Sequence, residues 1–338
     1  MKRLYLAIGA LLLSTRALAH HSFAPHFDAA QPVDLAGVIT EFEQRNPHAY
    51  LHLQVEDADG RRHDWRCETH GVTQLGRNGI STEMLAVGGT VRIQGSRHRR
   101  DPYQCFFDTV HLEDGRSLSV NGGRDNTPQE AQVAQRESLF GTWLLIPAGR
   151  PTSGPQFMFD FLTPAGKAAV AGYNPFTDDP TYRCEPVAVR RAWFAPGTPM
   201  AIEQRADDIV IRHEWMDVER VVHMGQAETP ATVPESILGY SRGHWEDETL
   251  VVETDRYAPG VLNQFVTVEG EPMRGLLHSN DLRTVERIRF DAASNTVQLI
   301  IEHSDPTYFS RAFPVVEASL AASDLRIQPF GCIPEALK

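Results

Sequence analysis

The stretch "AYLHLQVEDADGRRHDWRCE", residues 49–68, carries the pattern of a β-hairpin. Apolar and polar residues alternate on both sides of "DADG", and an Asp-Gly pair is typical of a tight turn between antiparallel strands. Similar short strands lie on either side of it: "VDLAGVITEFE" precedes the hairpin, and "TVRIQG", "CFFDTVHL" and "DGRSLSV" follow it. We therefore expect a small all-β domain.

A short helix is expected between the third and fourth of these strands. The segment "STEML" begins at Ser81, a residue type that caps helices, and it can form one or two turns before the Gly88-Gly89 pair. Five strands with a small helix in this position is the order of an OB-type barrel. Residues 20–120 are therefore predicted to form an OB-like five-stranded barrel.

The rest of the chain predicts a linker and a second all-β domain. Residues 121–138 are polar, contain glycine and proline and lack apolar periodicity, as linkers do. From residue 139 to 338, the strand-like segments include "MAIEQ", "DIVIRHEW", "ERVVHMG", "TLVVETDRY", "LRTVERIRF" and "TVQLIIEH", and only "TPAGKAAVAGY" looks helical. These segments favour a larger antiparallel barrel or a strongly curved sheet. The charged residues of "VERVV" and "VERIRF" are expected to point outward into solvent.

Residues 1–19 have the three parts of a secretory signal peptide. Lys2 and Arg3 precede an apolar run, and Ala17-Leu18-Ala19 is a small-residue cleavage motif. The run is ten residues long, whereas a membrane-spanning helix needs roughly 20. We expect cleavage after Ala19, a periplasmic or secreted location and no membrane span.

An oxidising compartment favours disulfides between the four cysteines, Cys67, Cys105, Cys184 and Cys332. Three pairings are possible. The pairing within each half is the simplest if each half folds alone. A four-thiolate metal site would need closer spacing. The net charge of −12 makes the chain a poor candidate for binding nucleic acid, whose phosphates attract basic proteins.

Histidines are concentrated in the first domain, with nine of the 14 between residues 20 and 111. If cleavage makes His20 the amino terminus, its α-amino and imidazole nitrogens can chelate one metal ion. Copper favours such nitrogen ligands, so copper is the expected ion and no other cofactor is expected. The third ligand is sought among His26, His48, His52 and His70. His48 is preferred because Pro47 fixes the entry into its strand and Asn46 can hold the turn. The alternative, ordinary strand-surface histidines without a metal, stays open.

Several motifs resemble known families. "HHSF", "GVITEFEQRNPHAYLHL" and "DGRRHDW" resemble exported bacterial domains of unknown function, over residues 20 to about 120. "GHWEDETLVVET" is similar to a strand pair of exported hypothetical proteins, although Glu248 stands where Asp is usual. Gly141-Thr142-Trp143 is similar to the Gly-x-Trp that opens lipocalin-like barrels. The last resemblance implies that the second domain is a lipocalin-like barrel.

The terminal histidine resembles the histidine brace of copper monooxygenases and of some periplasmic copper carriers. Small OB barrels also resemble periplasmic copper chaperones, which bind through strand methionines. This domain has only Met84, so a nitrogen-rich cupric site fits better than a methionine site. The sequence therefore predicts a periplasmic binding protein for a metal ion, with a small apolar ligand as a further candidate in the second domain.

The alternative function is an enzyme that acts on a small apolar substrate inside the second barrel. A histidine beside a carboxylate can act as a general base. The candidate acid–base residues are His213, Glu214, His223, His244 and His278. Known catalytic motifs such as Gly-x-Ser-x-Gly are absent from the sequence, so binding is preferred and the question of an enzyme is left open.

Overall fold

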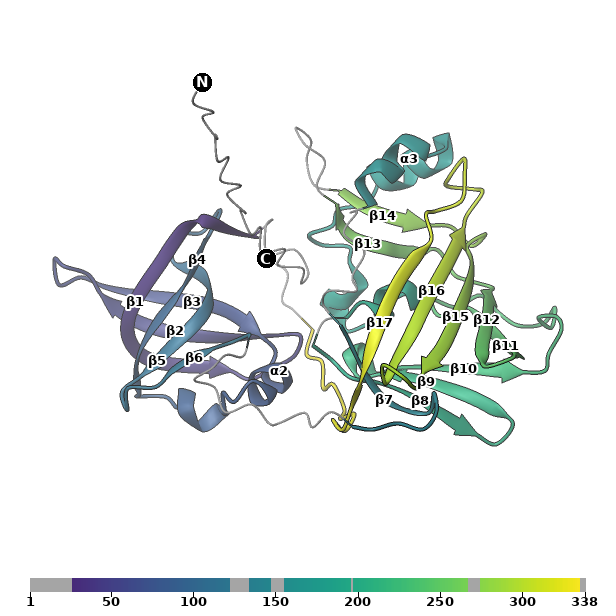
Figure 1. Ribbon diagram of the computed structural model, residues 1–338. Coiled ribbons are helices and arrows are strands. Elements are labelled where there is room, and N and C mark those ends of the chain that lie inside the picture. The colour runs from purple at the N-terminus through teal and green to yellow at the C-terminus, as the bar shows by residue number, and fades with distance from the viewer. Residues whose placement is uncertain (1–25, 122–133, 147–154, 196, 267–273, 335–338) are drawn as a thin grey trace, which may run out of the picture.

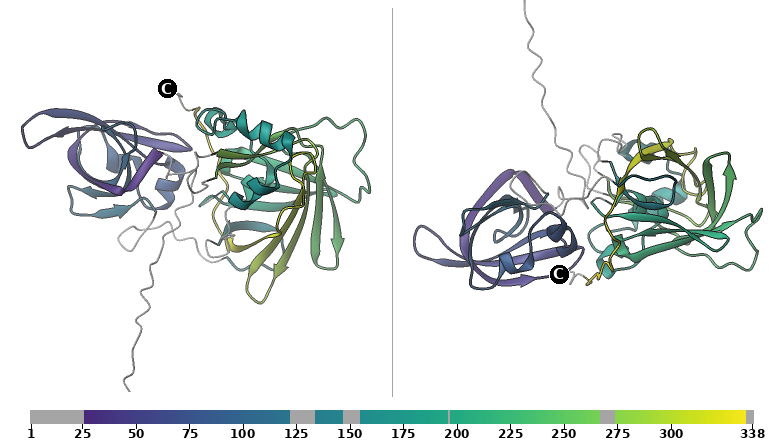
Figure 2. Two further views of the ribbon diagram at one scale, coloured as in Figure 1. Left: turned by 90° about the horizontal axis from the view of Figure 1, so that it is seen from above. Right: turned by 60° about the horizontal axis from the view of Figure 1, so that its bottom comes forward.

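The computed structural model describes residues 26–121, 134–146, 155–195, 197–266 and 274–334. Within these residues the chain is all-β, with one six-stranded sheet and one closed barrel, as the sequence predicts. Figures 1 and 2 show the two β units side by side from three directions. No helix in the described part of the chain is long and apolar enough to cross a membrane.

The first unit has the strand order of an OB-type barrel. β3 pairs in parallel with β5, so the sequence of neighbours β1-β2-β3-β5-β4 returns to β1. Helix α2 (Val72–Arg77) and the 3₁₀ helix η1 (Thr82–Leu85) lie between β3 and β4. This closed ring of strands confirms the predicted fold. The sequence predicts the helix at η1 but not α2. The strands are β1 Phe27–Glu43, β2 His48–Glu56, β3 Arg62–His70, β4 Thr90–His98, β5 Gln104–Leu112 and β6 Ser117–Ser119.

The β2–β3 hairpin forms where its alternating pattern predicts. Leu51 and Leu53 are completely buried and pair with Cys67 and Trp65 across the hairpin. In the turn, the Asp57 carboxylate accepts hydrogen bonds from two backbone amides that follow it, both 2.9 Å long. Gly60 has a φ of +76°, a conformation that glycine adopts without strain.

A disulfide closes the first barrel covalently. Cys67 of β3 and Cys105 of β5 are partners in the parallel pairing and are joined by a disulfide, with their Cα atoms 4.4 Å apart. The second disulfide joins Cys184 to Cys332. The predicted pairing within each half is therefore confirmed, and two disulfides fit an exported protein.

The second unit is a closed barrel of nine strands. Because nine is odd, neighbouring strands cannot all be antiparallel, and one pair must be parallel. That pair is β10 and β11, joined by the long connection 225–239. A lipocalin barrel has eight antiparallel strands, so this barrel differs in strand number and in that pair. Its strands are β7 Gly141–Leu145, β8 Met200–Arg205, β9 Asp208–His213, β10 Val218–Met224, β11 Tyr240–Glu246, β12 Thr249–Asp255, β15 Arg283–Asp291, β16 Thr296–Ser304 and β17 Val316–Ser323.

One end of this barrel is covered by a hairpin and a helix (Figure 1). The hairpin pairs β13 with β14, and helix α3 packs on β14. The sequence predicts α3, whose first turn is capped by the Thr163 hydroxyl accepting from Gly166 N at 3.1 Å. The remaining elements are β13 Gly260–Val266, β14 Arg274–His278, η3 Pro155–Phe161, α3 Pro164–Ala171, η4 Pro180–Arg183, α4 Val189–Trp193 and η5 Trp215–Asp217.

Trp143 anchors β7 in the barrel core. Its side chain is completely buried, and its indole N–H donates to the Leu139 carbonyl at 3.0 Å. The ring contacts Phe290, which is consistent with the resemblance of Gly141-Thr142-Trp143 to the start of lipocalin-like barrels.

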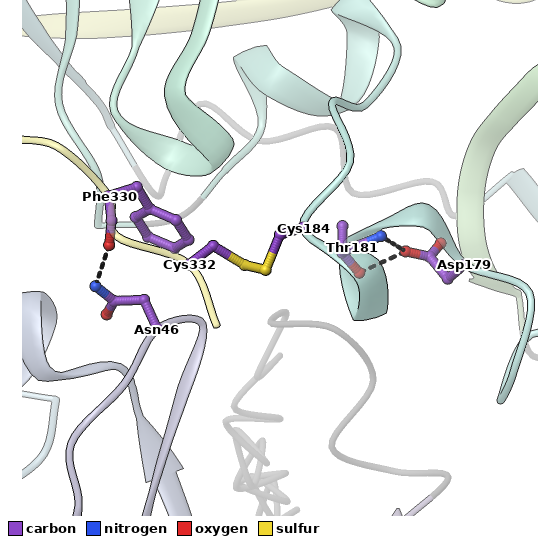
Figure 3. Close-up of a disulfide and its surroundings, with 6 residues drawn as sticks. All are labelled: Asn46, Asp179, Thr181, Cys184, Phe330 and Cys332. Carbon is purple, nitrogen blue, oxygen red and sulfur yellow. Dashed lines mark hydrogen bonds between the residues drawn. A yellow bond between two sulfur atoms is a disulfide. The ribbon is translucent and has the colours of Figure 1, made fainter. Parts of the chain in front are cut away.

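The C-terminal segment returns from β17 to the first unit (Figure 1) and is held by both units (Figure 3). Cys332 is bound to Cys184, and the Asn46 side chain donates to the Phe330 carbonyl at 2.5 Å. The Ile333 backbone amide donates to the backbone carbonyl of Asn46 at 3.0 Å. Gly71 is necessary beside this contact because a Cβ there would lie 2.0 Å from the Asn46 amide oxygen. Asn46 therefore joins the two units.

Candidate functional site

Two buried histidines lie side by side at one end of the first barrel. His48 begins β2 and His70 ends β3, and the two are direct partners in the antiparallel pairing. Each residue is only 6% exposed. Directly opposed residues have Cβ atoms about 5 Å apart, so both imidazoles can reach one ion.

An oxygen acceptor lies near one ring nitrogen of each histidine. His70 Nε2 is 2.8 Å from the Asn121 amide oxygen, so the nitrogen donates and Nδ1 keeps the lone pair. A Glu68 carboxylate oxygen lies 3.6 Å from His48 Nδ1. Burial lowers the pKa of His70, which keeps the imidazole in its neutral, ligating form. Such outer partners orient the histidines that hold metal ions.

His52 does not join this pair. It shares a face of β2 with His48, but four residues of strand separate them by about 13 Å. Its Nε2 lies 2.6 Å from a Glu43 carboxylate oxygen, to which Arg66 also donates. The side chain of His52 therefore belongs to a polar contact with Glu43 and Arg66.

The other two predicted ligands are placed differently. His26 lies beside Phe27 and His98, and its ring is 5.4 Å from Phe176 of the second domain. His20 is outside the described residues. Among residues that the structure describes, no group of three His, Cys, Asp or Glu side chains is arranged to hold a metal.

Two of the acid–base candidates lie on the outside of the second barrel. His223 stacks on Tyr240, with ring centroids 4.5 Å apart, and its Nδ1 is 3.2 Å from Asp208. His244 is half exposed and pairs with Glu246. Neither histidine shares a site with the candidates inside the barrel.

Glu214 lies between the two domains. Its carboxylate is completely buried and accepts two hydrogen bonds from Arg77 of α2, at 2.5 and 2.6 Å. The same carboxylate accepts a hydrogen bond from the backbone amide of Gln328, in the C-terminal segment, at 2.9 Å. Glu214 therefore connects the first domain, the barrel and the C-terminal segment.

The barrel interior contains a buried ion pair. Arg220 of β10 donates to Glu286 of β15, and the Trp193 indole of α4 donates to the same carboxylate. Arg220 is 4% exposed and Glu286 is completely buried. The prediction that the charges of "VERVV" and "VERIRF" all point outward is therefore wrong for these two residues. Arg220 lies on the same inward-facing side of β10 as Val218 and Val222, and Glu286 lies on the same side of β15 as Ile288. The charges of Arg220 and Glu286 neutralise each other.

His213 also lies inside the barrel, next to this network. Its ring meets Trp193 edge to face at 5.0 Å, and its Nδ1 has no hydrogen-bond partner among the described residues. Burial, and secondarily Arg220, lower the pKa of His213 to about 3. The imidazole is neutral at physiological pH.

A row of polar side chains crosses the barrel wall. Ser241, Thr254, Thr284 and His303 are direct neighbours on β11, β12, β15 and β16. All four are at most 3% exposed, and the first two share a hydrogen bond of 2.9 Å. The barrel interior is therefore not uniformly apolar.

His278 ends β14 of the hairpin that covers this barrel. It is completely buried, and its ring lies 5.8 Å from that of Tyr257. Nδ1 donates to the Ser279 carbonyl at 3.0 Å, which leaves Nε2 as an acceptor without a hydrogen-bond partner in the described structure. Burial lowers the pKa of His278.

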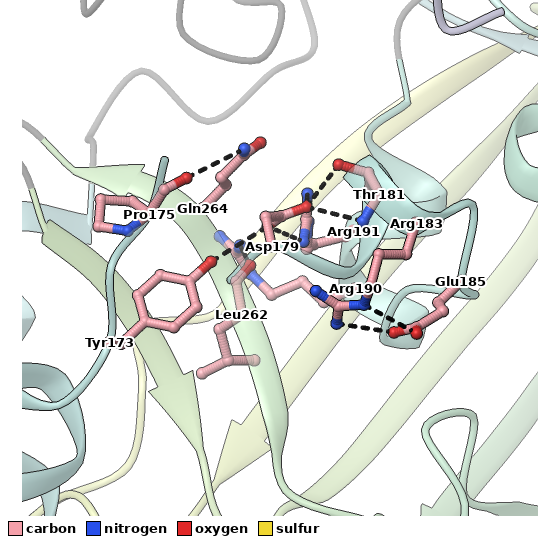
Figure 4. A network of polar contacts seen from close by, with 10 residues as sticks. All are labelled: Tyr173, Pro175, Asp179, Thr181, Arg183, Glu185, Arg190, Arg191, Leu262 and Gln264. Carbon is pink, nitrogen blue, oxygen red and sulfur yellow. Dashed lines mark hydrogen bonds and ion pairs between the residues drawn. The ribbon is translucent and has the colours of Figure 1, made fainter. Parts of the chain in front are cut away.

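Two neighbouring arginines of α4 have different surroundings (Figure 4). Arg191 pairs with the completely buried Asp179 at 2.8 Å, and this carboxylate also accepts from Thr181 and Tyr173. Arg190 donates only to the Leu262 carbonyl, at 3.2 Å, and has no carboxylate partner among the described residues. One arginine is therefore structurally paired, while the other keeps unused donors.

A polar cavity of about 470 Å³ lies on the outer side of the barrel. It is bounded by the 225–239 connection and by the turn that precedes β15. Its carboxylates have partners: Asp255 binds Thr229 and Arg283, and Glu235 binds Asn280. Existing protein contacts therefore satisfy much of its charge.

Comparison with protein families places the first domain in a known group of sequences. Residues 9–104 match the model of a family of unknown function (DUF6152). The match spans β1 to β4 and includes His48 and His70, as the resemblance to a domain of unknown function implies. No curated protein matches the chain.

Proposed function

We propose that the protein binds a metal ion, with copper preferred, through the first domain. The ligands are the imidazoles of His48 and His70 together with the α-amino and imidazole nitrogens of His20. The proposal includes export and cleavage after Ala19, which frees the terminal amine. His70 replaces His26 and His52 as a preferred ligand because it lies directly opposite His48.

The direct pairing of His48 and His70 is the observation that carries this proposal. Two imidazoles on neighbouring strands, together with a terminal chelate, would supply nitrogen ligands of the type that cupric ion prefers. Asn121 and Glu68 support the proposal because metal-binding histidines commonly have an oxygen partner at the second ring nitrogen.

Titration of the oxidised protein beginning at His20 with cupric ion tests the proposal. We expect binding near one equivalent and a paramagnetic resonance spectrum of nitrogen ligation. His48→Gln or His70→Gln should weaken binding at least tenfold, and an added residue before His20 should also weaken it strongly. His63→Gln is the matched control, because His63 lies on the same hairpin but pairs with Asp57 and stacks on Tyr103.

Two results would contradict the proposal. Unchanged affinity in both His48 and His70 variants would exclude this histidine pair as ligands. Unchanged affinity after the N-terminal extension would remove the terminal chelate and leave a simpler histidine site.

The structure offers less support for the enzyme alternative. His223 and His244 lie outside the barrel, Glu214 binds Arg77, and only His213 and His278 lie in the interior. The five candidates therefore do not form one acid–base group, and binding remains the preferred function.

A further inference from the structure

The covered end of the second barrel brings together three basic side chains that form no ion pair with a described carboxylate. Arg190 of α4, His278 of β14 and His303 of β16 come from three elements of the chain. His278 pairs with Gly260 of β13, and Arg190 donates to the carbonyl of Leu262, two residues further along the same strand. The Tyr257 hydroxyl bonds Thr284, the direct neighbour of His303, and the Tyr257 ring lies 5.8 Å from that of His278. In agreement with this arrangement, burial together with Arg190 and His278 lowers the pKa of His303 to about 3. One guanidinium and two imidazoles therefore form a cluster at this end of the barrel.

Arg190 is the charged member of this cluster. The residue as a whole is of intermediate exposure. Burial and the neighbouring Arg191 lower the pKa of Arg190 to about 10, which still leaves the group charged at physiological pH. Among the described residues, the Arg190 side chain donates one hydrogen bond, to the Leu262 carbonyl at 3.2 Å, although a guanidinium has five N–H groups. Figure 4 shows Arg190 beside the paired Arg191.

The nearby carboxylates are occupied by other groups. Asp179 binds Arg191, and Glu286 binds Arg220. Asp305 accepts from the Ser279 amide at 2.6 Å and from the Ser279 hydroxyl at 2.7 Å. Arg190 therefore has no ion pair with any carboxylate that the structure describes.

His303 adds hydrogen-bonding capacity next to this charge. The residue is 3% exposed, and neither of its ring nitrogens has a hydrogen-bond partner among the described residues. The neutral ring has one N–H that can donate to an anion. Buried polar groups normally have partners, so two unsatisfied nitrogens on one ring point to a ligand.

Aromatic side chains border the same place. The ring of Phe313 lies 5.4 Å from that of His303, and Phe309 lies 4.5 Å from Phe313. Apolar lining with a few polar groups is typical of sites for small organic molecules.

We propose that the covered end of the barrel binds a small organic carboxylate, with Arg190 pairing its charge and His303 donating a hydrogen bond. A carboxylate is the group that a guanidinium fork binds with two parallel hydrogen bonds. The apolar part of the ligand lies against Phe313 and Phe309. This site is independent of the proposed metal site. The proposal refines the small apolar ligand expected for the second domain to one that also carries a carboxylate.

Benzoate serves as the probe, with benzamide as a neutral molecule of the same shape. The oxidised full-length protein is titrated with each by calorimetry, and thermal unfolding is followed in parallel. We expect benzoate to bind and to raise the melting temperature with concentration, while benzamide does neither. Arg190→Met should weaken benzoate binding at least tenfold, and His303→Phe should weaken it severalfold.

The unliganded variants separate a binding role from a structural one. Arg190→Met should melt no lower than the wild type, because it removes a charge that has no ion-pair partner. Arg191→Met should melt lower, because it leaves Asp179 without its arginine. A large loss of stability in Arg190→Met would show that Arg190 is structural and would overturn the proposal.

Arg283→Met is the control for location, since Arg283 lines the outer cavity and is largely exposed. We expect this variant to bind benzoate as the wild type does. Absence of benzoate binding to the wild type, equal binding of benzamide, or loss of binding in Arg283→Met instead of Arg190→Met would each overturn the proposal.

Discussion

Arg77 of the first domain and Glu214 of the second form a two-point ion pair in which the carboxylate is completely buried. Replacing Arg77 by Met would leave this carboxylate without its counter-charge. Breaking a buried pair on one side typically costs about 3–5 kcal/mol. We expect a loss of that order in the free energy of unfolding, measured by denaturant titration.

The pair between Arg92 and Asp34 provides the control for this variant. It also has two short hydrogen bonds, but its side chains are 54% and 46% exposed. Arg92→Met should therefore change stability little. Equal effects of the two substitutions would contradict a special role for the pair at the domain boundary.

Asn46→Ala should loosen the C-terminal segment. The variant loses the hydrogen bond to the Phe330 carbonyl and the 2.8 Å bond to Thr73. We expect faster amide hydrogen exchange in residues 328–333, measured by mass spectrometry. Asn295→Ala, which frees the Ala134 carbonyl instead, should leave exchange in that segment unchanged. Unchanged exchange in the Asn46 variant would show that the disulfide and the backbone contacts to Glu214 and Asp217 hold the segment without the Asn46 side chain.

Arg220→Met should destabilise the second barrel by about 3–5 kcal/mol, because Glu286 would remain buried without a counter-charge. The double variant Arg220→Met with Glu286→Leu should recover part of this loss, since no isolated charge remains. The measurement is chemical unfolding of all three proteins. A double variant less stable than the single one would show that the network contributes more than mutual neutralisation.

Stability should fall as pH decreases below about 6.5. An unfolded histidine titrates near that pH, whereas burial, Arg190 and His278 lower the pKa of His303 to about 3 in the folded protein. The unfolded chain therefore binds more protons between these values, which favours unfolding by up to about 1.4 kcal/mol per pH unit for this group. His303→Gln should reduce the slope of unfolding free energy against pH between 6.5 and 5.

His244→Gln is the matched control for pH dependence, because this side chain is 50% exposed. Its slope should equal that of the wild type. If His303→Gln leaves the slope unchanged as well, the other buried groups account for the pH dependence.

The fold was largely predictable from alternation and turn residues, which are local signals. β13, β14 and β17 were missed for different reasons. β13 and β14 are short apolar runs without clear alternation. β17 places small residues such as Ala318 and Ala322 in the core, and these give a weak hydrophobic pattern. The helix α2 has six residues, too few for a helical period to stand out.

Less of the site could be predicted, because it depends on partners far apart in the chain. Arg220 and Glu286 do occupy the inward phase of their strands, but charged residues are seldom buried, so an outward position was preferred. Asn46 and Phe330 lie 284 residues apart, and no local pattern connects them. Arg190 and Arg191 are neighbours of the same residue type, and the sequence does not show that only Arg191 pairs with a carboxylate, that of Asp179.

The disulfide between Cys184 and Cys332 encloses eight of the nine strands of the second barrel in one covalent loop. β7 is the exception, since it precedes Cys184, yet it fills the gap between β17 and β8. With five residues, it is also the shortest of the nine described strands. β7 therefore forms a seam of the barrel, because it is the one strand of the nine that the disulfide loop does not include. Departure of β7 would withdraw Trp143 from the core, so its fluorescence would report the opening of that seam.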